Sequence, residues 1–437
     1  MRGKYLIIPC LFLWSAGVSA QQKWNLQQCI SHAQAHNVQL KQQAQVVKNQ
    51  EINLNSARNN RLPGVDASAS QSFNFGRGLT IENTYVNRNT LSTSFSANAS
   101  MSVYDGGQIT RNIQVQKLQL EASLADLTRA QENLSLQVAS VYLEVLFQEE
   151  LLGVARQQCQ LSQSQADRIK KLLDAGKAAE SEWADAKALV AADEMSATQA
   201  ENNYRLSLLT LSQLLELPSP EGFSVVKPEL PAEADVVLPL PDAIMADAVG
   251  IKPEIKASEY RVKSAERSIL LAKTGYYPKL SLGAGLGTSY YKTSGYETTS
   301  FGRQMRENFN RYIGLSLSVP VFNRLQTRNQ IRSARVQLYT QQLALEQTRK
   351  DIYKEIQQAY YNAMAAQRQC LSALAAEEAS QASFALTATK YENGQSTATE
   401  FQEAKTRLAK AQSDGLQARY SFFFRTKILD FYRGVPF

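Results

Sequence analysis

The sequence predicts an α+β protein that is written as an internal tandem repeat, with long coiled-coil helices and four amphipathic strands. Three observations support this prediction. Two stretches of about seventy residues contain almost no glycine and no proline, as long helices require. Between helical stretches, the hydrophobic pattern changes to alternation, which is typical of strands. A turn motif occurs twice, as DAGKAAESEWADAK at 174–187 and ENGQSTATEFQEAK at 392–405.

Residues 1–20 are expected to be a secretory signal peptide. Arg2 and Lys4 precede an apolar run, and small residues follow at Val18-Ser19-Ala20. This order is typical of a signal that is cleaved after Ala20. The apolar run is too short to be a membrane-spanning helix, and no later segment approaches the required eighteen apolar residues.

The composition argues against several classes of function. The chain has 47 Lys and Arg against 40 Asp and Glu, without a concentrated basic tract, so we expect no nucleic-acid partner. No phosphate-binding loop or nucleophile motif is present, so we expect no enzyme and no cofactor. His32 and His36 are the only histidines, and no third ligand is evident near them, so no metal site is expected. Cys29, Cys159 and Cys370 match no metal or redox spacing.

The tandem repeat divides the mature chain into three parts. The first repeat spans residues 21–217, and the second spans residues 241–437. A proline-rich linker, 218–240, separates them. The glycines of the two turn motifs, Gly176 and Gly394, lie at matching positions in the two repeats.

Each repeat is expected to contain one long helix and two shorter ones. The long helices cover about 108–175 and 324–393, and at about 1.5 Å per residue each extends roughly 100 Å. No globular core accommodates such a helix, so it must pair with others along its length. Heptad steps such as Ile113, Leu120 and Leu127 predict coiled-coil packing. The shorter helices, about 26–61, 179–217, 242–276 and 397–431, would stack end to end to match each long helix. Gly176 and Gly394 would then cap the long helices at the bend of a hairpin.

Four amphipathic strands lie between the helices, at about 65–75, 91–104, 279–291 and 311–322. Apolar residues alternate there with Ser, Gly and Asn, and the strand lengths suit a tilted crossing of a bilayer. The connecting stretches, about 76–90 and 291–311, are long and polar. Four strands cannot close a barrel, and lipid does not tolerate an open edge, so subunits must share the barrel. Two chains would give eight strands and three would give twelve.

The mature chain resembles the TolC-like outer membrane efflux protein family along its whole length. The resemblance rests on the opening WNLQQCISHAQAHNVQLK, on the junction SVYDGGQ with its echo SVPVFNRLQ, and on both glycine turns. It implies a homotrimer whose chains contribute four strands each to a twelve-stranded transmembrane β-barrel. Below this barrel, a long α-helical coiled-coil barrel would extend through the periplasm.

The resemblance also implies a function. The trimer would be the outer-membrane exit duct of a tripartite efflux or type I secretion system in a Gram-negative bacterium. It would sit in outer-membrane lipid and export small molecules or proteins with a periplasmic adaptor and an inner-membrane pump of the RND or ABC type. The alternative is a secreted trimeric coiled-coil scaffold or adhesin without a pore.

The resemblance assigns roles to the two turns. Gly176, Lys177, Gly394 and Gln395 would form the tips on which the adaptor docks. Residues behind the turns would form the pore constriction or gate, and these are Glu182, Asp185, Tyr391, Glu400 and Glu403. Tyr391 is expected to bond with Glu182 in the closed state. The family's arginine two residues after the second glycine is replaced here by Ser396, which puts that closed-state lock in doubt.

Overall fold

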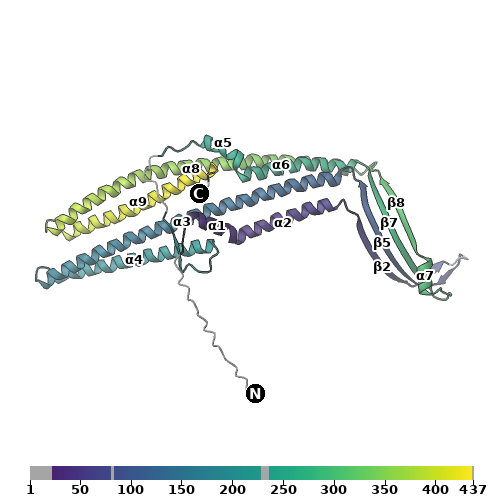
Figure 1. Cartoon of the computed structure of the whole chain (residues 1–437), viewed down its shortest axis with the longest axis horizontal. Helices are drawn as coiled ribbons and strands as arrows, with labels where there is room; N and C mark the ends of the chain where they lie inside the picture. Colours follow the sequence, from purple (N-terminus) through teal and green to yellow (C-terminus); the bar gives the residue numbers. More distant parts are fainter. Residues whose placement is uncertain (1–21, 80–82, 228–235, 436–437) are drawn as a thin grey trace, which may run out of the picture. The chain divides into compact units, whose positions relative to one another are not determined.

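The computed structural model describes residues 22–79, 83–227 and 236–435 and confirms the α+β fold class (Figure 1). The predicted signal peptide and part of the proline-rich linker lie outside the described residues. Contacts divide the chain into two units. The hairpin unit contains the residues up to Lys41, Ala130–Ile251 and the chain from Ile352 onward. The sheet unit contains Gln42–Arg129 and Lys252–Asp351.

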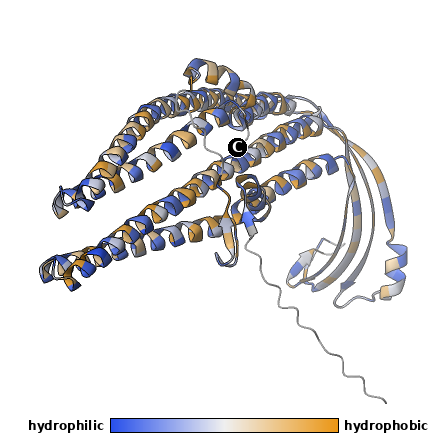
Figure 2. Cartoon of the chain, turned by 60° about the vertical axis from the view of Figure 1, so that its left-hand side comes forward, coloured by the Kyte–Doolittle hydropathy of each residue, from blue (hydrophilic) through white to orange (hydrophobic). Residues whose placement is uncertain are grey.

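The long helices and their returns have matching lengths in the two repeats. Helices α3 (Gln108–Asp174) and α8 (Gln326–Glu392) each have 67 residues. The returning helices α4 (Glu180–Leu214) and α9 (Ala398–Tyr432) each have 35 residues. Figure 1 shows α4 beside α3 and α9 beside α8, and Figure 2 shows hydrophilic and hydrophobic residues interleaved along these helices. This colouring is typical of helices that bury one face.

Small side chains allow the two arms of each hairpin to approach closely. Ala166 of α3 packs with Ala186 and Val190 of α4. Ala366 and Cys370 of α8 pack with Phe422 of α9. No helix within the described part of the chain combines the length and the apolar character that a bilayer crossing requires.

The shorter helices before the strands are each broken once, so the prediction of continuous helices over 26–61 and 242–276 was wrong. Helix α1 (Leu26–His36) is followed by α2 (Val38–Asn59). Between them Asn37 leaves the helical conformation, and its side-chain oxygen accepts a hydrogen bond from the Leu40 amide at 3.1 Å. Asparagine favours such local caps over helix interiors.

The second break has a different cause. Helix α5 (Pro241–Ile251) is followed by α6 (Pro253–Ala272) and a short 3-10 turn, η1 (Lys273–Tyr276). Lys252 precedes a proline, whose ring disfavours the helical conformation of the residue before it. Pro253 then begins α6, where its missing N–H removes no helical hydrogen bond.

The hairpin unit also contains a small parallel sheet that joins distant segments. Strand β1 (Gln22–Trp24) pairs with β6 (Phe223–Val225). The hydroxyl of the buried Tyr142 of α3 donates to the Val226 carbonyl at 2.5 Å, lies 3.1 Å from the Trp24 carbonyl and accepts from the Val226 amide. Burial raises the pKa of Tyr142 to about 12, so its hydroxyl remains a donor at any physiological pH.

The sheet unit carries an antiparallel four-stranded sheet at the places where the alternation predicts it. Its strands follow the order β2 (Gly64–Asn74), β5 (Thr90–Tyr104), β7 (Lys279–Thr293) and β8 (Asn310–Ser318). Strand β8 ends earlier than expected because Pro320 has no N–H for pairing. The predicted loops hold a small hairpin, β3 (Arg77–Leu79) with β4 (Tyr85–Asn87), and a short helix, α7 (Phe301–Glu307).

The two faces of the sheet differ in chemistry. On one face, three serine pairs across β2 and β5 form hydroxyl–hydroxyl hydrogen bonds of 2.7 to 2.8 Å, namely Ser68–Ser96, Ser70–Ser94 and Ser72–Ser92. On the other face, large apolar side chains are exposed, including Val65 and Phe73 of β2 and Ile313, Leu315 and Leu317 of β8. Exposed apolar surface of this extent marks contact with lipid or with another protein.

Candidate functional site

The two glycine turns have the same backbone geometry. Gly176 and Gly394 have φ angles of +69° and +71°, in the left-handed region that favours glycine. In the first turn the amides of Gly176 and Lys177 donate to the carbonyls of Leu173 and Leu172, at 2.8 and 2.7 Å. In the second turn the amides of Gly394 and Gln395 donate to Tyr391 and Lys390, at 3.1 and 2.8 Å. Both are Schellman caps.

The four residues that the sequence assigns to the tips therefore lie at helix bends with exposed surfaces. Gly176, Lys177, Gly394 and Gln395 are all exposed. A Cβ atom added to either glycine would meet nothing within 4 Å, so the conformation alone requires glycine there.

The helices after the two turns begin differently. Helix α4 has no side-chain cap at Ala179. Helix α9 begins with a capping box, in which Thr397 Oγ1 accepts from the Glu400 amide at 3.2 Å and Glu400 Oε2 accepts from the Thr397 amide at 2.9 Å. The Ser396 hydroxyl also donates to Glu400 Oε2, at 2.6 Å. Ser396, at the position where the resemblance implied an arginine, therefore stabilises the cap of α9 by donating to the Glu400 carboxylate.

These donors act on the acidity of Glu400. In the single chain they lower the pKa of Glu400, the Ser396 hydroxyl having the largest effect and the Thr397 amide the next. Because its folded pKa is depressed, the cap is complete above the ordinary glutamate pKa and is lost as pH falls through the folded value.

Tyr391 lies where the two hairpins meet, but its hydrogen-bond partner differs from the expected Glu182. Gln165 Nε2 of α3 donates to Tyr391 Oη at 2.6 Å. Arg168, one turn further along α3, donates to the Glu392 carbonyl at 2.9 Å and lies 5.7 Å from the centre of the Tyr391 ring. The Tyr391 ring also stacks on the Phe401 ring, with 4.9 Å between the ring centres. Arg168 thus supplies a guanidinium at the second tip from the other hairpin.

A cavity of about 640 Å³ brings four of the five predicted gate residues together. Glu182 and Asp185 line it from α4, Tyr391 from α8 and Glu403 from α9. Glu400 is not among the lining residues, because its carboxylate is held at the start of α9. The remaining lining residues are Gln165, Ile169, Ala186, Leu189, Ala398, Thr399, Phe401 and Gln402. Three carboxylates therefore face one space between the hairpins, close to both turns.

Behind this cavity, a buried charge ties the two hairpins together. The Lys405 side chain of α9 is only 3% exposed, and its Nζ binds Asp193 of α4 and Ser162 of α3. Ser162 also donates to Asp193. A buried ammonium without a partner is strongly disfavoured, so this cluster opposes separation of the hairpins.

The sequence contained a signal for this cluster that we did not interpret. Lys405 lies among Phe401, Ala404 and Leu408, the residues that form the buried face of α9. A lysine on a buried helical face requires an acidic or polar partner from a neighbouring element. The partners of Tyr391, Gln165 and Arg168, had no such signal, since they lie more than two hundred residues away.

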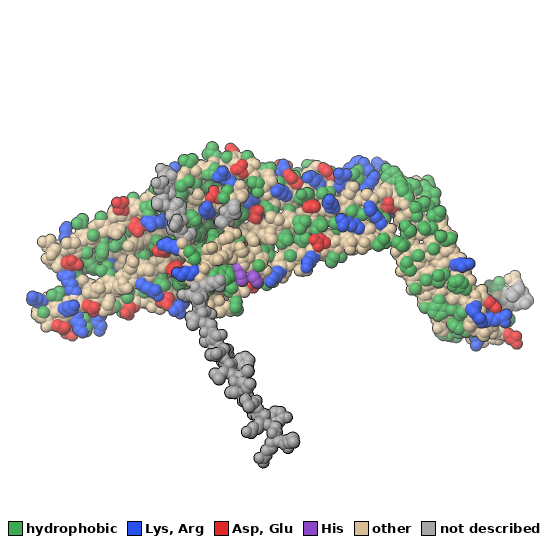
Figure 3. Space-filling model, viewed as in Figure 1, with side chains coloured by type: hydrophobic (Ala, Val, Ile, Leu, Met, Phe, Trp, Pro, Cys, Tyr) green, Lys and Arg blue, Asp and Glu red, His purple; other side chains and the backbone are tan. Residues whose placement is uncertain are grey.

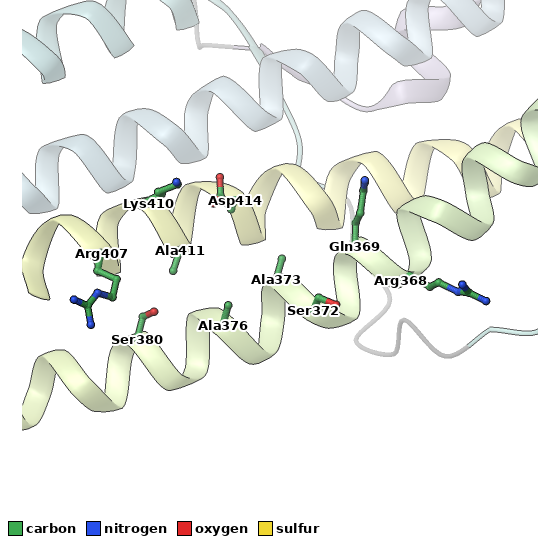
Figure 4. Close-up of a pocket in the computed structure, with 10 residues that line it drawn as sticks. All are labelled: Arg368, Gln369, Ser372, Ala373, Ala376, Ser380, Arg407, Lys410, Ala411 and Asp414. Carbon is green, nitrogen blue, oxygen red and sulfur yellow. The ribbon is translucent and has the colours of Figure 1, made fainter.

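A second hollow lies between the arms of the second hairpin and contains none of the predicted site residues (Figure 4). It has a volume of about 580 Å³. Figure 4 shows Ala373 and Ala376 of α8 pointing towards Ala411 of α9, while Arg368 points away from the hollow. Four charged residues line this groove, of which Arg368, Arg407 and Lys410 are basic and Asp414 is acidic.

The histidine pair stacks on the surface of α1. The rings of His32 and His36 lie 4.1 Å apart, and His36 Nδ1 lies 3.0 Å from the His32 carbonyl. Partial burial and the nearby His36 lower the pKa of His32. Among the described residues, no group of three or more His, Cys, Asp or Glu side chains could hold a metal ion.

The buried ion pair gives a direct prediction for stability. Asp193→Asn leaves the Lys405 ammonium buried without its counter-charge, and we expect it to destabilise the protein by about 3 kcal/mol. Lys405→Met together with Asp193→Leu removes both charges and should recover most of this loss. Thermal unfolding of the purified protein in detergent measures both effects.

An exposed pair on α4 provides the matched control. Arg205 and Glu201 are one helical turn apart, and the arginine side chain is 74% exposed. Arg205→Met should change the free energy of unfolding by less than about 0.5 kcal/mol. Equal effects of Asp193→Asn and Arg205→Met would contradict the structural role of the Lys405 cluster.

Comparison with known proteins places the chain among efflux proteins. Residues 29–216 and 246–423 match the family model described as outer membrane efflux protein. The chain is 28% identical over 213 residues to the fusaric acid resistance protein FusA of Burkholderia cepacia. This match covers 49% of this chain and 39% of FusA. The chain therefore spans well under two thirds of that curated relative.

Two further comparisons cover most of the chain. It is 23% identical over 420 residues to the outer membrane protein TolC of Escherichia coli, covering 92% of this chain and 81% of TolC. The structure of the outer-membrane channel OprN matches with a TM-score of 0.73 and 21% identity over 94% of this chain and 90% of OprN, which shows a shared fold.

The family match covers both repeats, including the two long helices and most of their returns. Proteins of this family are transport conduits of the Gram-negative outer membrane that extend into the periplasm, and they are not enzymes. The chain belongs to the outer membrane efflux protein family.

Proposed function

We propose that three copies of the chain form an exit duct through the outer membrane. The observation that carries this proposal is the four-stranded sheet with exposed edges. Strands β2 and β8 each lack a neighbour on one side in the described sheet, and their residues are exposed along their whole length. Lipid does not tolerate unpaired edges. Joining β8 of one copy to β2 of the next would pair every edge, and three copies would give a twelve-stranded barrel with room for a channel.

The chemistry of the two sheet faces supports this arrangement. The exposed apolar face would contact lipid, and the face with the serine pairs would line the channel. The duct would pass small molecules or proteins. Conductance of the purified protein in planar bilayers, together with a mass of three copies by native mass spectrometry, tests the proposal. A monomer, or a trimer without conductance, would favour the alternative of a coiled-coil scaffold.

We further propose that the cavity between the hairpins is part of the gate. The Tyr391 contacts with Gln165 and Arg168 would hold the hairpins together in the closed state, and Glu182, Asp185 and Glu403 would present negative charge at the mouth. The Lys405 cluster behind them would keep the hairpins aligned. Glu400 lies in the first turn of α9, close to Glu403 in sequence. It would contribute to the gate mainly by capping that helix.

Tyr391→Phe should raise the open probability of the channel. The change removes the hydroxyl that accepts from Gln165 but keeps the aromatic ring on which Arg168 lies. The lost hydrogen bond contributes about 1 kcal/mol per chain, and three chains would lose it together. Single-channel recording measures the effect. Tyr361→Phe, on an exposed residue of the same helix, is the control, and equal open probabilities for the two variants would refute the lock.

Neutralising the cavity carboxylates should reduce cation selectivity. A combined variant, Glu182→Gln with Asp185→Asn and Glu403→Gln, removes three charges per chain that would attract cations at a narrow mouth. Reversal potentials in a salt gradient measure the change. Glu400→Gln and Glu403→Gln, made singly, are matched in charge, and only Glu400 is held in the cap. The gate assignment is wrong if Glu400→Gln shifts selectivity as much as Glu403→Gln.

We propose that the exposed tips bind a periplasmic adaptor that links the duct to an inner-membrane pump of the RND or ABC type. Both tips present a backbone bend with small neighbours, which permits close approach of another helical hairpin. The two bends also share one backbone geometry, so a single kind of partner surface could fit either of them.

A photo-reactive residue at Lys177 or Gln395 should therefore form cross-links with an adaptor in intact cells. Because these side chains take no part in the Schellman hydrogen bonds, the substitution leaves the turn intact. Mass spectrometry identifies the captured protein. The same residue at Lys292, at the far end of β7, is the control. Adaptor capture from the control position, or from neither tip, would contradict tip docking.

A further inference from the structure

The two junctions between sheet and long helix share a backbone but differ in sequence. In the first repeat, Gly106 and Gly107 have φ angles of +67° and +80°. In the second repeat, the corresponding residues are Arg324 and Leu325, with φ angles of +54° and +62°. Glycine adopts this left-handed conformation freely, whereas side chains with a Cβ atom are disfavoured in it. The second junction therefore holds two consecutive residues in an unfavourable conformation.

The first junction has an additional reason to use glycine. A Cβ atom on Gly106 would lie 2.6 Å from the Cβ atom of Tyr277, which is too close for any side chain. At the corresponding positions of the second junction, Arg324 and Leu325 carry side chains, whereas Gly106 of the first junction has no room for one. It keeps the left-handed backbone while it places an arginine and a leucine on the surface, and both are exposed.

The position of this arginine is fixed by the surrounding hydrogen bonds. Asn323 Nδ2 donates to Thr327 Oγ1 at 2.6 Å, and the Gln326 amide donates to the Asn323 carbonyl at 3.0 Å. Thr327 is buried against Gly275, whose carbonyl accepts from the threonine hydroxyl at 3.3 Å. The junction is thus a defined turn that presents Arg324 to one side.

Arg324, two residues before α8 begins, is followed by three arginines in the first turns of that helix. These three are spaced by four and three residues, so they lie on one helical face, and they are exposed like Arg324. Together the four are called the arginine stripe of α8. The stripe consists of Arg324, Arg328, Arg332 and Arg335. None of them has an ion-pair partner within the described residues, and no acidic residue occurs on the chain from Arg324 until Glu346. Figure 3 shows Lys and Arg side chains gathered where the helices meet the sheet.

This stripe is unfavourable for the isolated helix. Positive side chains repel the positive end of the helix dipole, and the first turn of α8 has no acidic residue to offset them. Like charges one turn apart also destabilise a helix. Backbone strain, the helix dipole and mutual repulsion all make these arginines unfavourable for the folded protein. An external negative partner would offset the two charge effects.

The surface next to the stripe indicates what that partner is. Val321 and Phe322, directly before the junction, are 92% and 76% exposed, and Leu325 is half exposed. Along the chain they follow Ile313, Leu315 and Leu317 of β8, which are exposed as well. An apolar strand followed by an exposed aromatic ring and then by an arginine is typical of the boundary between the membrane core and the headgroups.

We propose that the arginine stripe of α8 binds the anionic headgroups of phospholipids in the leaflet that borders the helical end of the sheet. The inference rests on the outer-membrane location of the family and does not require the proposed gate. At about 1.5 Å per residue, Arg328 lies roughly 3 Å along the axis from Gln326, the first residue of α8, so Arg324 and Arg328 both fall within a headgroup layer of about 5–8 Å. Arg332 and Arg335 lie within about a Debye length of that layer and attract it through solvent.

Native mass spectrometry of the full mature protein tests lipid binding. The probes are phosphatidylglycerol and phosphatidylcholine with the same acyl chains. Each arginine near an anionic surface strengthens binding about fivefold, so Arg324→Gln with Arg328→Gln should weaken phosphatidylglycerol binding about twenty-fivefold and leave phosphatidylcholine binding unchanged. Arg332→Gln with Arg335→Gln should have a smaller effect that disappears at high salt.

A matched control removes two arginines of the hairpin unit that likewise form no ion pair with any residue the structure describes. Arg368→Gln with Arg407→Gln lowers the net charge by the same amount and should leave phosphatidylglycerol binding unchanged. Equal loss of binding in the control and in the stripe variants would overturn the proposal, because general charge would then explain it. A change of ion selectivity in the stripe variants, with lipid binding intact, would also overturn it and would place the stripe in the channel.

A second variant separates strain from binding. Arg324→Gly with Leu325→Gly restores the sequence type of the first junction and relieves the backbone, so it should raise the melting temperature in neutral detergent without lipid. The same variant keeps Arg328, Arg332 and Arg335, so it should lose only part of the stabilisation that added phosphatidylglycerol gives to the natural protein, in line with about fivefold weaker binding. If phosphatidylglycerol stabilises the variant as strongly as the natural protein, the proposal is refuted.

Discussion

The structure depends on one constraint, which is that a helix of 67 residues must bury one face along its whole length. Neither long helix can do this against a globular core, so each needs antiparallel partners of the same total length. Small residues such as Ala166 and Ala366 let the arms approach closely enough to exclude water. Because the returning helices have equal lengths in both repeats, the two glycine turns reach the same level. The cavity with its acidic residues, and the contacts of Tyr391, exist only because the tips coincide.

Local sequence rules predicted most of the fold. Alternation located all four strands of the large sheet, and the glycine turns were predicted at the residues that adopt positive φ. The rules failed where one residue overrode a periodic pattern. Asn37 and Pro253 each break a helix that otherwise continues the apolar period, and Pro320 shortens β8. In each case the residue type itself predicts the interruption, whereas the surrounding apolar pattern predicts a continuous helix or strand.

The candidate site was only partly predictable, because its specific contacts join residues that are far apart in sequence. The sequence assigned Tyr391 to a lock but not to Gln165, which lies 226 residues away. Repetition was also misleading. Lys187 and Lys405 occupy the same position of the repeated motif, yet Lys187 lies over the Trp183 ring, 4.7 Å from its centre, while Lys405 is buried against Asp193. Which copy of a duplicated lysine becomes structural is decided by the neighbouring hairpin, and spacing alone carries no information about it.

The serine pairs of the sheet have a consequence for a conduit. In each pair one hydroxyl already donates to the other, so half of the hydroxyl donors of these six serines are used within the sheet itself. Along this row a passing solute meets small, neutral groups with one free donor in each pair. Such a wall binds a passing solute weakly, whatever the chemistry of the solute. A duct lined in this way leaves the choice of cargo to the proteins that load it.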